Sequence, residues 1–265
     1  MPSTYVAVVT GATRGIGQST ADALSRRGVT VVTLGRDARS TIVCDLASLD
    51  SIRAAATEIG ARFPRLRLLV NNAGVQHVRR KVTSDGLEAT LAVNHLAPFL
   101  LTHLLLPNLR SGAPSRVVTV SSSLARWGRV DFEDLESSRR YNGTRAYLQS
   151  KLANIMFTLT LAERLGASDV SAACVYPGLV VTDLLRERWW WRSRWLRPFW
   201  RALFVSPNDA AVAVLAAADG EIPRSERECC FTVGGRRVPV PRRARDADAR
   251  RRLWEESARL VGIDG

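Results

Sequence analysis

Residues 5–17 read Tyr-Val-Ala-Val-Val-Thr-Gly-Ala-Thr-Arg-Gly-Ile-Gly, an apolar β-branched run that ends in a turn containing three glycines. From residue 16 to residue 27 the apolar side chains recur at helical spacing, so the region is predicted to be strand, turn and helix. Gly11 permits the tight turn, while Gly15 and Gly17 let a phosphate group and the helix approach the backbone. The helix N-terminus then faces the phosphate, which favours a nucleotide-binding unit.

Similar apolar runs recur along the chain, separated mostly by segments of helix length. Buried parallel strands look like this because helices cover both faces of their sheet. The pattern predicts an α/β fold, a doubly wound parallel sheet with helices on both faces, built as a single domain over residues 1–265. After Tyr176 the pattern breaks into a Trp- and Arg-rich insertion, followed by a helix over 208–218. The expected strands are 5–10, 30–34, 41–44, 66–70, 116–120, 170–176 and a last one near Phe231.

The composition of the chain limits its partners. Its 265 residues are 46% hydrophobic, enough for one large core. The net charge of +13 raises the question of an anionic partner, since a one-sided basic surface attracts phosphate. However, Lys81 and Lys151 are the only lysines among 38 basic residues, which indicates a general bias toward arginine. Since the sequence contains no known nucleic-acid-binding motif, we expect no nucleic-acid partner.

The cysteines, histidines and apolar runs indicate the compartment. No apolar run reaches the roughly 18–20 residues that cross a bilayer, and residues 1–4 lead directly into the first strand. We therefore expect a soluble, unprocessed, cytoplasmic protein. The cysteines and histidines lack the spacing of a metal-ligand set, so we expect free thiols and no metal. These residues are Cys44, Cys174, Cys229, Cys230, His77, His95 and His103.

The end of the second strand indicates which nucleotide binds. An acidic residue there would hold the ribose hydroxyls of NAD, but this chain has Gly35-Arg36. Arg36 and Arg14 can pair with a 2′-phosphate through charge-assisted hydrogen bonds, which favours NADP(H). The neighbouring Asp37 leaves NAD(H) as the alternative. Because the next strand follows after few residues, the adenosine pocket is expected to be open.

The segment Tyr147-Leu-Gln-Ser-Lys151 supplies a candidate acid/base. Hydride transfer to a carbonyl leaves an alkoxide that needs a proton, and a phenol with a pKa of about 10 needs a nearby cation to serve. Four residues apart on a helix, the phenol and the ammonium share one face. We therefore expect Lys151 to lower the pKa of Tyr147. A solvated helical pair without a catalytic role is the alternative.

These motifs together resemble the short-chain dehydrogenase/reductase family. The wide glycine spacing, Asn71-Asn-Ala-Gly74, the Tyr-x-x-x-Lys pair and Pro177-Gly178 followed by Thr182 all match its pattern. Local phrases such as 93–96 and 150–154 are similar to the retinol-dehydrogenase-like branch. The resemblance implies a Rossmann fold and an oxidoreductase that acts on a small carbonyl or alcohol, which for this branch is often lipophilic.

The resemblance also implies the roles of individual residues. Ser122 would hold the substrate oxygen, and the family spacing to the tyrosine selects it over Ser121 and Ser123. The implied catalytic set is Asn94, Ser122, Tyr147 and Lys151. The implied cofactor-binding residues are Gly11, Thr13, Arg14, Gly15, Ile16, Gly17, Arg36, Asp45, Leu46, Asn72, Ala73, Gly74, Tyr147, Lys151, Pro177, Gly178, Val180 and Thr182.

The insertion, at about 184–206, is predicted to be a variable cap over the substrate. Its tryptophans Trp189, Trp191 and Trp195 would line a large apolar pocket suited to a bulky substrate. A membrane-surface helix and a homo-oligomer interface are the alternatives for this segment. For the whole protein, the alternatives are a non-catalytic cofactor-binding protein and a membrane-surface protein.

Overall fold

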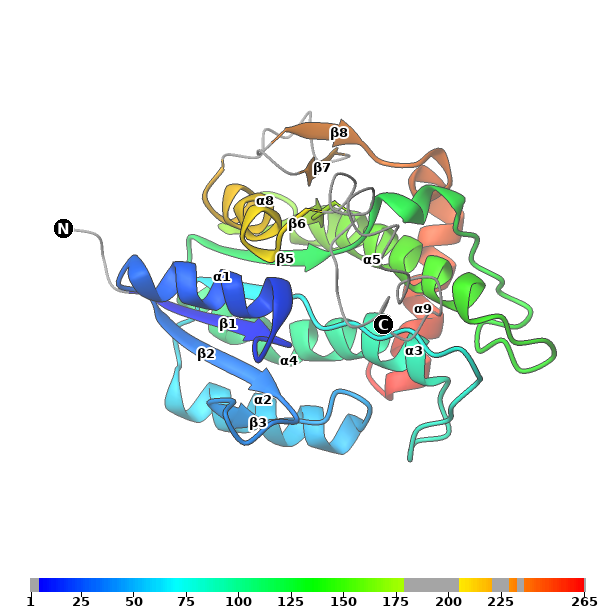
Figure 1. The fold of residues 1–265 in the computed structure, drawn as a ribbon, viewed down its shortest axis with the longest axis horizontal. Coiled ribbons are helices and arrows are strands. Elements are labelled where there is room, and N and C mark those ends of the chain that lie inside the picture. Colours follow the sequence, from blue (N-terminus) through cyan, green and yellow to red (C-terminus); the bar gives the residue numbers. More distant parts are fainter. Residues whose placement is uncertain (1–4, 179–204, 221–228, 233–235, 265) are drawn as a thin grey trace, which may run out of the picture.

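The computed structural model of the chain describes residues 5–178, 205–220, 229–232 and 236–264 (Figure 1). The strands are β1 Val6–Thr10, β2 Thr30–Gly35, β3 Ile42–Val43, β4 Leu68–Asn71, β5 Ser115–Val120, β6 Val170–Tyr176, β7 Cys229–Thr232 and β8 Arg237–Pro239. The helices are α1 Gly15–Arg26, α2 Leu49–Arg62, α3 Ala89–Leu91, α4 Ala97–Ser111, α5 Gly143–Leu165, α8 Pro207–Asp219 and α9 Ala247–Val261. Shorter helical turns are η1 Ala92–Leu96, η2 Ser123–Trp127 and η7 Arg242–Arg245.

The described strands form one eight-stranded sheet in the order β3-β2-β1-β4-β5-β6-β7-β8. Neighbours are parallel from β3 through β7, so the predicted doubly wound parallel sheet is confirmed. Strand β8 pairs antiparallel with β7 and was not predicted, because three residues give too short a pattern. The strand order reverses between β1 and β4, and ligands of such sheets bind at the carboxyl ends of the strands beside that point.

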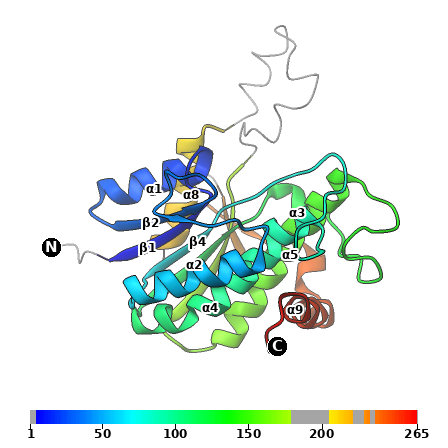
Figure 2. The ribbon, with the colours of Figure 1, turned by 90° about the horizontal axis from the view of Figure 1, so that it is seen from below.

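Helices cover both faces of the sheet, as Figure 2 shows. Helices α1 and α8 lie on one face, over a core of small and β-branched side chains from β1, β4, β5 and β6. Helices α2, α4 and α5 cover the other face, and α9 packs outside α4 and α5. Three cysteines, Cys44, Cys174 and Cys230, are buried free thiols in these cores, as predicted. The sequence pattern therefore correctly predicted helices on both faces of the sheet.

One apolar stretch is longer than the sequence inspection expected. Residues Ala89–Ser111, which include α3, η1 and α4, are long and apolar enough to cross a membrane. However, 78% of its most apolar window is buried inside the protein, as in the core helix of a globular domain. The expectation that no run reaches this length was wrong, because the polar pairs Asn94-His95 and Thr102-His103 interrupt the run only briefly.

The connection between β2 and β3 is short for a parallel pair, since only residues 36–41 join them. A turn closes it, in which the Ser40 N–H donates to the carbonyl of Asp37 at 2.9 Å. The side chains of Thr33 and Thr41 also bond each other and each other's backbone N–H. The connection is therefore a closed structure fixed by local hydrogen bonds, and not merely a shortened loop.

Candidate active site

The glycine turn after β1 has the backbone shape that the sequence predicts. Gly11 and Gly15 adopt φ values of +64° and +60°, which side chains other than glycine rarely tolerate. A Cβ on Gly17 would collide with the carbonyl oxygen of Gly11 and the side-chain amide of Asn72. The turn can form with this geometry only because these positions lack side chains.

Asn72 braces the glycine turn from the neighbouring strand. Its amide Nδ2 donates to the carbonyl of Thr10 at 2.8 Å, and its backbone N–H donates to the Thr10 hydroxyl at 2.9 Å. The N–H of Ala73 donates to the same hydroxyl at 3.0 Å. Asn72 and Ala73 therefore join the carboxyl ends of β1 and β4 and hold the turn over the switch point.

The residues of the turn fit a dinucleotide phosphate. Helix α1 has no acidic residue in its first turn, and its N-cap residue Arg14 makes no side-chain cap hydrogen bond. No atom lies within 4 Å of a Cβ built on Gly15, which leaves open space beside the backbone. Helix N-termini with exposed N–H groups attract anions. Thr13 and Ile16 lie partly exposed on the same turn.

The end of β2 presents the residues predicted to choose the cofactor. Arg36 is exposed there. The Asp37 carboxylate is held by Arg39, whose Nε and Nη2 donate to it at 2.9 and 2.7 Å and whose backbone N–H donates at 2.9 Å. These hydrogen bonds hold the pKa of Asp37 well below its usual range. Sequence reasoning missed Arg39, and the signal that would have found it is its spacing of two residues from Asp37.

Asp45 and Leu46 lie in the turn between β3 and α2. The Asp45 carboxylate accepts the N–H of Ala47 at 3.0 Å, and its own N–H donates to the Ser51 hydroxyl at 2.9 Å. Leu46 is buried. Asp45 therefore shapes this turn at the edge of the predicted adenosine pocket.

Helix α5 carries Tyr147 and Lys151 on one face, as predicted from their spacing. The Asn142 side chain caps this helix by accepting the N–H groups of Thr144 and Arg145. The Lys151 ammonium is buried and donates to the carbonyl of Val120, the last residue of β5, at 3.0 Å. It lies 5.8 Å from the centroid of the Tyr147 ring.

The pKa of Tyr147 is shifted in the direction opposite to the prediction. Burial raises it to about 12, against the smaller opposing effect of a hydrogen bond from Ser122. Burial likewise lowers the pKa of Lys151 to about 8. The expectation that Lys151 lowers the pKa of Tyr147 was wrong for the protein alone, because burial dominates the shift and the smaller opposing effect comes from Ser122.

The three consecutive serines after β5 differ in their contacts. The Ser121 hydroxyl is buried and donates to the backbone carbonyl of Lys151 at 2.6 Å, which anchors α5 to β5. The Ser122 hydroxyl accepts the N–H of Leu124 at 3.2 Å, leaving its own proton for Tyr147. Ser123 begins η2 and is partly exposed. The structure thus brings Ser122, of the three, to the phenol.

Asn94 is fully buried in η1, a π-helical turn. Its Oδ1 accepts the N–H of Val75 at 2.7 Å, and its Nδ2 donates to the Val75 carbonyl and the Ser150 hydroxyl, both at 2.9 Å. Pro98 explains the turn, because proline has no N–H for the Asn94 carbonyl four residues earlier. Sequence reasoning missed this turn, which such a proline indicates.

Gly74 lies where these side chains meet. A Cβ on it would stand 3.3 Å from the Lys151 ammonium and 3.5 Å from Asn94 Oδ1. A side chain at this position would therefore press on the Lys151 ammonium, whereas its contact with Asn94 would be an ordinary one. Asn94, Ser122, Tyr147 and Lys151 thus gather around the carboxyl ends of β4 and β5.

The remaining predicted residues lie at the end of β6 or beyond the described chain. Pro177 and Gly178 follow β6 directly, and Gly178 has a φ of +81°. Val180, Thr182 and the predicted cap at 184–206, except its last two residues, lie outside the described residues. In the part of the chain that the structure describes, no three His, Cys, Asp or Glu side chains are grouped to hold a metal.

Comparisons with known proteins agree with this arrangement. Residues 5–193 match the family model of short chain dehydrogenases. The chain is 40% identical to human retinol dehydrogenase 12 over 281 residues, 97% of this chain and 86% of that protein. A solved structure from Mycobacterium paratuberculosis is 34% identical with a TM-score of 0.79, covering 98% of this chain and 94% of the other.

A metagenomic short-chain oxidoreductase, solved in complex with NADP, is 27% identical with a TM-score of 0.58. That similarity covers 81% of this chain and 90% of the other. Together with the sheet order and the glycine turn, the match to the family model over most of the chain shows that this protein belongs to the short-chain dehydrogenase family, with similarity to retinol dehydrogenases.

Proposed function

We propose that the protein is an NADP(H)-dependent oxidoreductase that transfers a hydride between nicotinamide and a carbonyl or alcohol. The observation that carries the proposal is the meeting of Ser122, Tyr147 and Lys151 at the carboxyl ends of the central strands. A half-buried phenol that is hydrogen-bonded to one hydroxyl and lies beside one ammonium is arranged for proton transfer and not for structural support alone.

The residues around the adenosine pocket support NADP(H), with NAD(H) as the alternative. Arg36 and Arg14 are exposed at the end of β2 and on the glycine turn. Asp37, the acidic residue that favours NAD(H), already accepts three hydrogen bonds from Arg39. Its charge is therefore largely matched within the turn, and less of it opposes a 2′-phosphate. The similar metagenomic enzyme was solved in complex with NADP.

Each side chain of the site has its own role in the proposed reaction. The bound nicotinamide supplies or accepts the hydride. With substrate bound, Ser122 would turn its O–H proton from Tyr147 to the substrate oxygen and hold it, and Tyr147 donates a proton to that oxygen during reduction. Because the pKa of Tyr147 is raised to about 12, the phenol carries its proton at neutral pH and is ready to act as the acid. Lys151 holds its position through the Val120 carbonyl.

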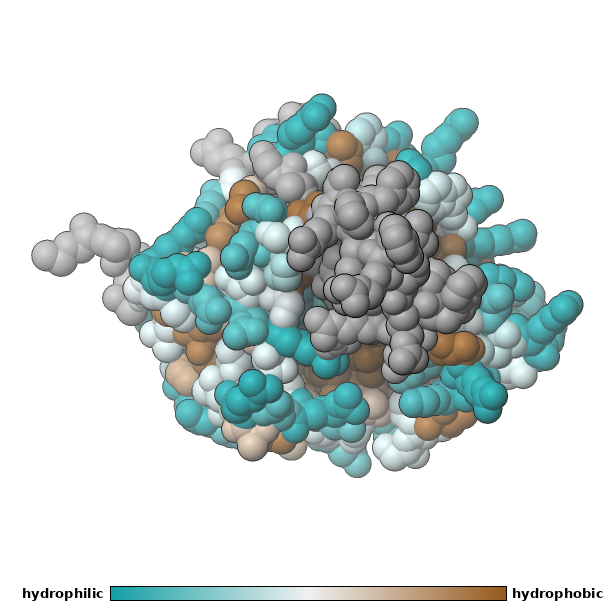
Figure 3. Space-filling view, in the orientation of Figure 1, coloured by the Kyte–Doolittle hydropathy of each residue, from teal (hydrophilic) through white to brown (hydrophobic). Residues whose placement is uncertain are grey.

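The substrate is proposed to be a bulky, lipophilic carbonyl or alcohol. The basis is the similarity to retinol dehydrogenase 12 and the Trp-rich sequence of the insertion. The described surface exposes few large hydrophobic side chains, and only two of them share a segment. They are Val43, Val78, Val82, Trp127 and Val212. Figure 3 shows small hydrophobic areas between hydrophilic ones on one face.

Replacing Tyr147 with phenylalanine tests the proposal. The variant Tyr147→Phe keeps the ring and its packing but loses the proton, so NADPH-dependent reduction of retinaldehyde and other lipophilic aldehydes should fall by about 10²–10⁴-fold. Binding of NADPH, measured by fluorescence titration, should stay within about twofold of the wild type. Wild-type protein that binds NADPH but reduces nothing in a broad aldehyde and ketone panel would support the non-catalytic alternative. Comparable turnover by the variant would remove Tyr147 from the mechanism.

A further inference from the structure

His95 lies beside Asn94 on the π-helical turn and connects that turn to the C-terminal helix. Its side chain is only 1% exposed, and its Nε2 lies 2.8 Å from the Ser257 hydroxyl of α9. The two residues are 162 positions apart in the chain. This contact is the polar link that the structure describes between η1 and α9.

The hydrogen-bond pattern fixes the protonation of the His95 ring. The Ser257 hydroxyl donates its single proton to the carbonyl of Leu253 at 2.7 Å, so it can only accept from His95. His95 Nε2 therefore carries the hydrogen and donates it. Burial lowers the pKa of His95 to about 4, against a smaller opposing effect of the Asn154 side chain, so the ring is neutral at pH 7. The contact is a neutral bond from a defined tautomer.

Aromatic side chains surround this bond and exclude water from it. The His95 ring lies 6.3 Å from the Phe99 ring and 6.4 Å from the Phe157 ring, measured between centroids. Trp254 of α9 packs against both phenylalanines, at 4.9 and 6.0 Å. A hydrogen bond in such surroundings is costly to break, because neither partner can turn to water.

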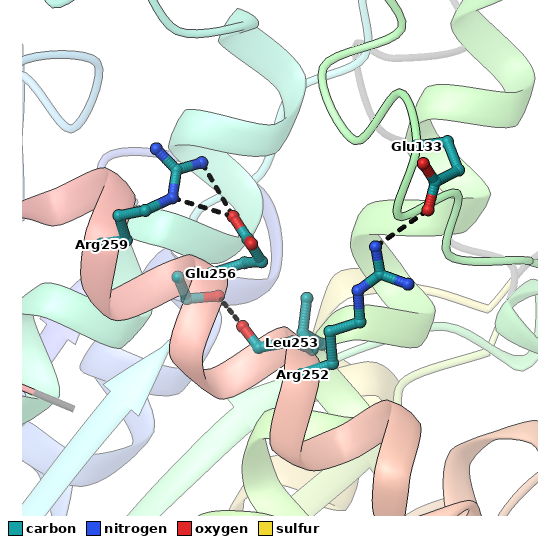
Figure 4. A network of polar contacts seen from close by, with 6 residues as sticks. Glu133, Arg252, Leu253, Glu256 and Arg259 are labelled. Atoms are coloured by element: carbon teal, nitrogen blue, oxygen red, sulfur yellow. Dashed lines mark hydrogen bonds and ion pairs between the residues drawn. The ribbon is translucent and has the colours of Figure 1, made fainter.

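Helix α9 is a firm support for the bond. Figure 4 shows the ion pairs of Arg252 with Glu133 and of Arg259 with Glu256, on either side of Leu253. At the end of the helix, Arg53 of α2 donates to the carbonyl of Val261 at 2.6 Å. The helix is therefore held from two other parts of the chain, and His95 is tied to a fixed point.

The π-helical turn that carries Asn94 needs the stabilisation that the His95–Ser257 hydrogen bond gives. A π-helical turn is less favourable than the α-helix on either side of it, and Pro98 already prevents the regular hydrogen bond there. The Asn94 amide must keep its position to hold Val75, which follows Gly74, and Ser150, which precedes Lys151. A shift of the turn would move the backbone on both sides of the site.

We propose that His95 is a positioning residue, whose hydrogen bond to Ser257 holds the π-helical turn so that Asn94 orients the active site. The inference rests on the proposed oxidoreductase function for its kinetic readout only. Its structural readout, the protection of the Val75 and η1 amides, is independent of any activity.

The experiment compares substitutions on both sides of the bond. His95→Leu and Ser257→Ala should each lower kcat by about tenfold, leave the dissociation constant of NADPH within about twofold and speed hydrogen exchange at Val75 and η1. His95→Gln should restore most of the lost turnover, because the glutamine Nε2–H can reach the same hydroxyl. The double variant should be no worse than the worse single variant.

His103 is the matched control. Its ring belongs to the same aromatic cluster, 4.8 Å from the Phe99 ring and 5.2 Å from the Trp254 ring, and its hydrogen bond is to the Phe99 carbonyl of its own helix α4. His103→Leu should change stability without changing kcat or exchange at Val75. Equal kcat losses in His95→Leu and His103→Leu, or unchanged exchange at Val75 in Ser257→Ala, would overturn the inference. A wild type without turnover would refute the proposed function, while the exchange result would still decide this one.

Discussion

Ser121 and Ser122 are adjacent in the chain, yet their hydroxyls serve different partners. Ser121 points to the backbone of α5, where it donates to the carbonyl of Lys151 at 2.6 Å. Ser122 faces the other way, toward the Tyr147 hydroxyl. Successive residues of an extended segment point to opposite sides, so a shift by one residue exchanges a structural contact for a catalytic one.

This difference predicts opposite effects for the same substitution. Ser122→Ala should lower kcat/KM by about 10²–10³-fold with little change in melting temperature, because it removes a donor to the reacting oxygen. Ser121→Ala should keep most of the turnover but lower the free energy of unfolding by about 1 kcal/mol, because it removes one buried hydrogen bond between the end of β5 and α5. Steady-state kinetics and thermal unfolding measure both. The reverse ranking would make Ser121 the catalytic serine.

The connection between β2 and β3 acts as an element of its own. It is shorter than a helical crossover, and the Asp37–Arg39 pair and the Ser40 turn give it a fixed shape. The sequence indicated an open adenosine pocket, but did not show that Arg39 holds the one carboxylate in this connection. Because Arg39 pairs with the Asp37 carboxylate, Asp37 repels a 2′-phosphate less than its sequence position indicates.

Removing Arg39 should shift the cofactor preference. In Arg39→Ala the Asp37 carboxylate is released beside Arg36, so the ratio of NADPH to NADH affinity should fall by about threefold, the size expected for exposed charge pairs. Asp37→Asn in the same variant should restore the ratio. Fluorescence titration with both cofactors at low and high salt is the measurement, and the effect should shrink at high salt. An unchanged ratio would separate Asp37 from the cofactor pocket.

In the folded protein, the C-terminal helix α9 covers the buried side chain of His95. Helix α9 packs on α4 and α5 and reaches η1 through Ser257. The charged and titratable groups near His95 come from several elements. They are His103 on α4, Glu163 and Arg164 on α5, and Arg250 on α9, which pairs with Glu163 at 2.6 Å.

This packing predicts acid sensitivity. The folded pKa of His95 is about 4 and the unfolded pKa about 6.5, so only the unfolded chain binds a proton between these values. Stability should therefore be complete above pH 6.5 and fall by up to about 3 kcal/mol as the pH drops toward 4. His95→Gln should lose less stability over this range, measured by urea unfolding. His103 contributes with the same sign in both proteins, so the difference between them isolates His95.

The local features of this protein could be predicted from its sequence alone. Hydrophobic runs identified the parallel strands, the glycines identified the turn, and a spacing of four placed Tyr147 and Lys151 on one helical face. These features depend on residues close together in the chain and on backbone geometry, so a pattern of neighbours is enough to reveal them. The match to the family model supports this interpretation of the motifs.

The interactions between groups from distant segments could be identified only in the folded protein. The raised pKa of Tyr147, the partner of Ser121 and the bond of His95 to Ser257 join residues from distant segments. Burial and hydrogen bonding depend on which side chains surround a group after packing. Neither the composition nor the spacing of residues in the sequence predicts those neighbours. For this protein the sequence therefore determined which groups are present, whereas the packing decided which way their pKa values move and which neighbours hold them.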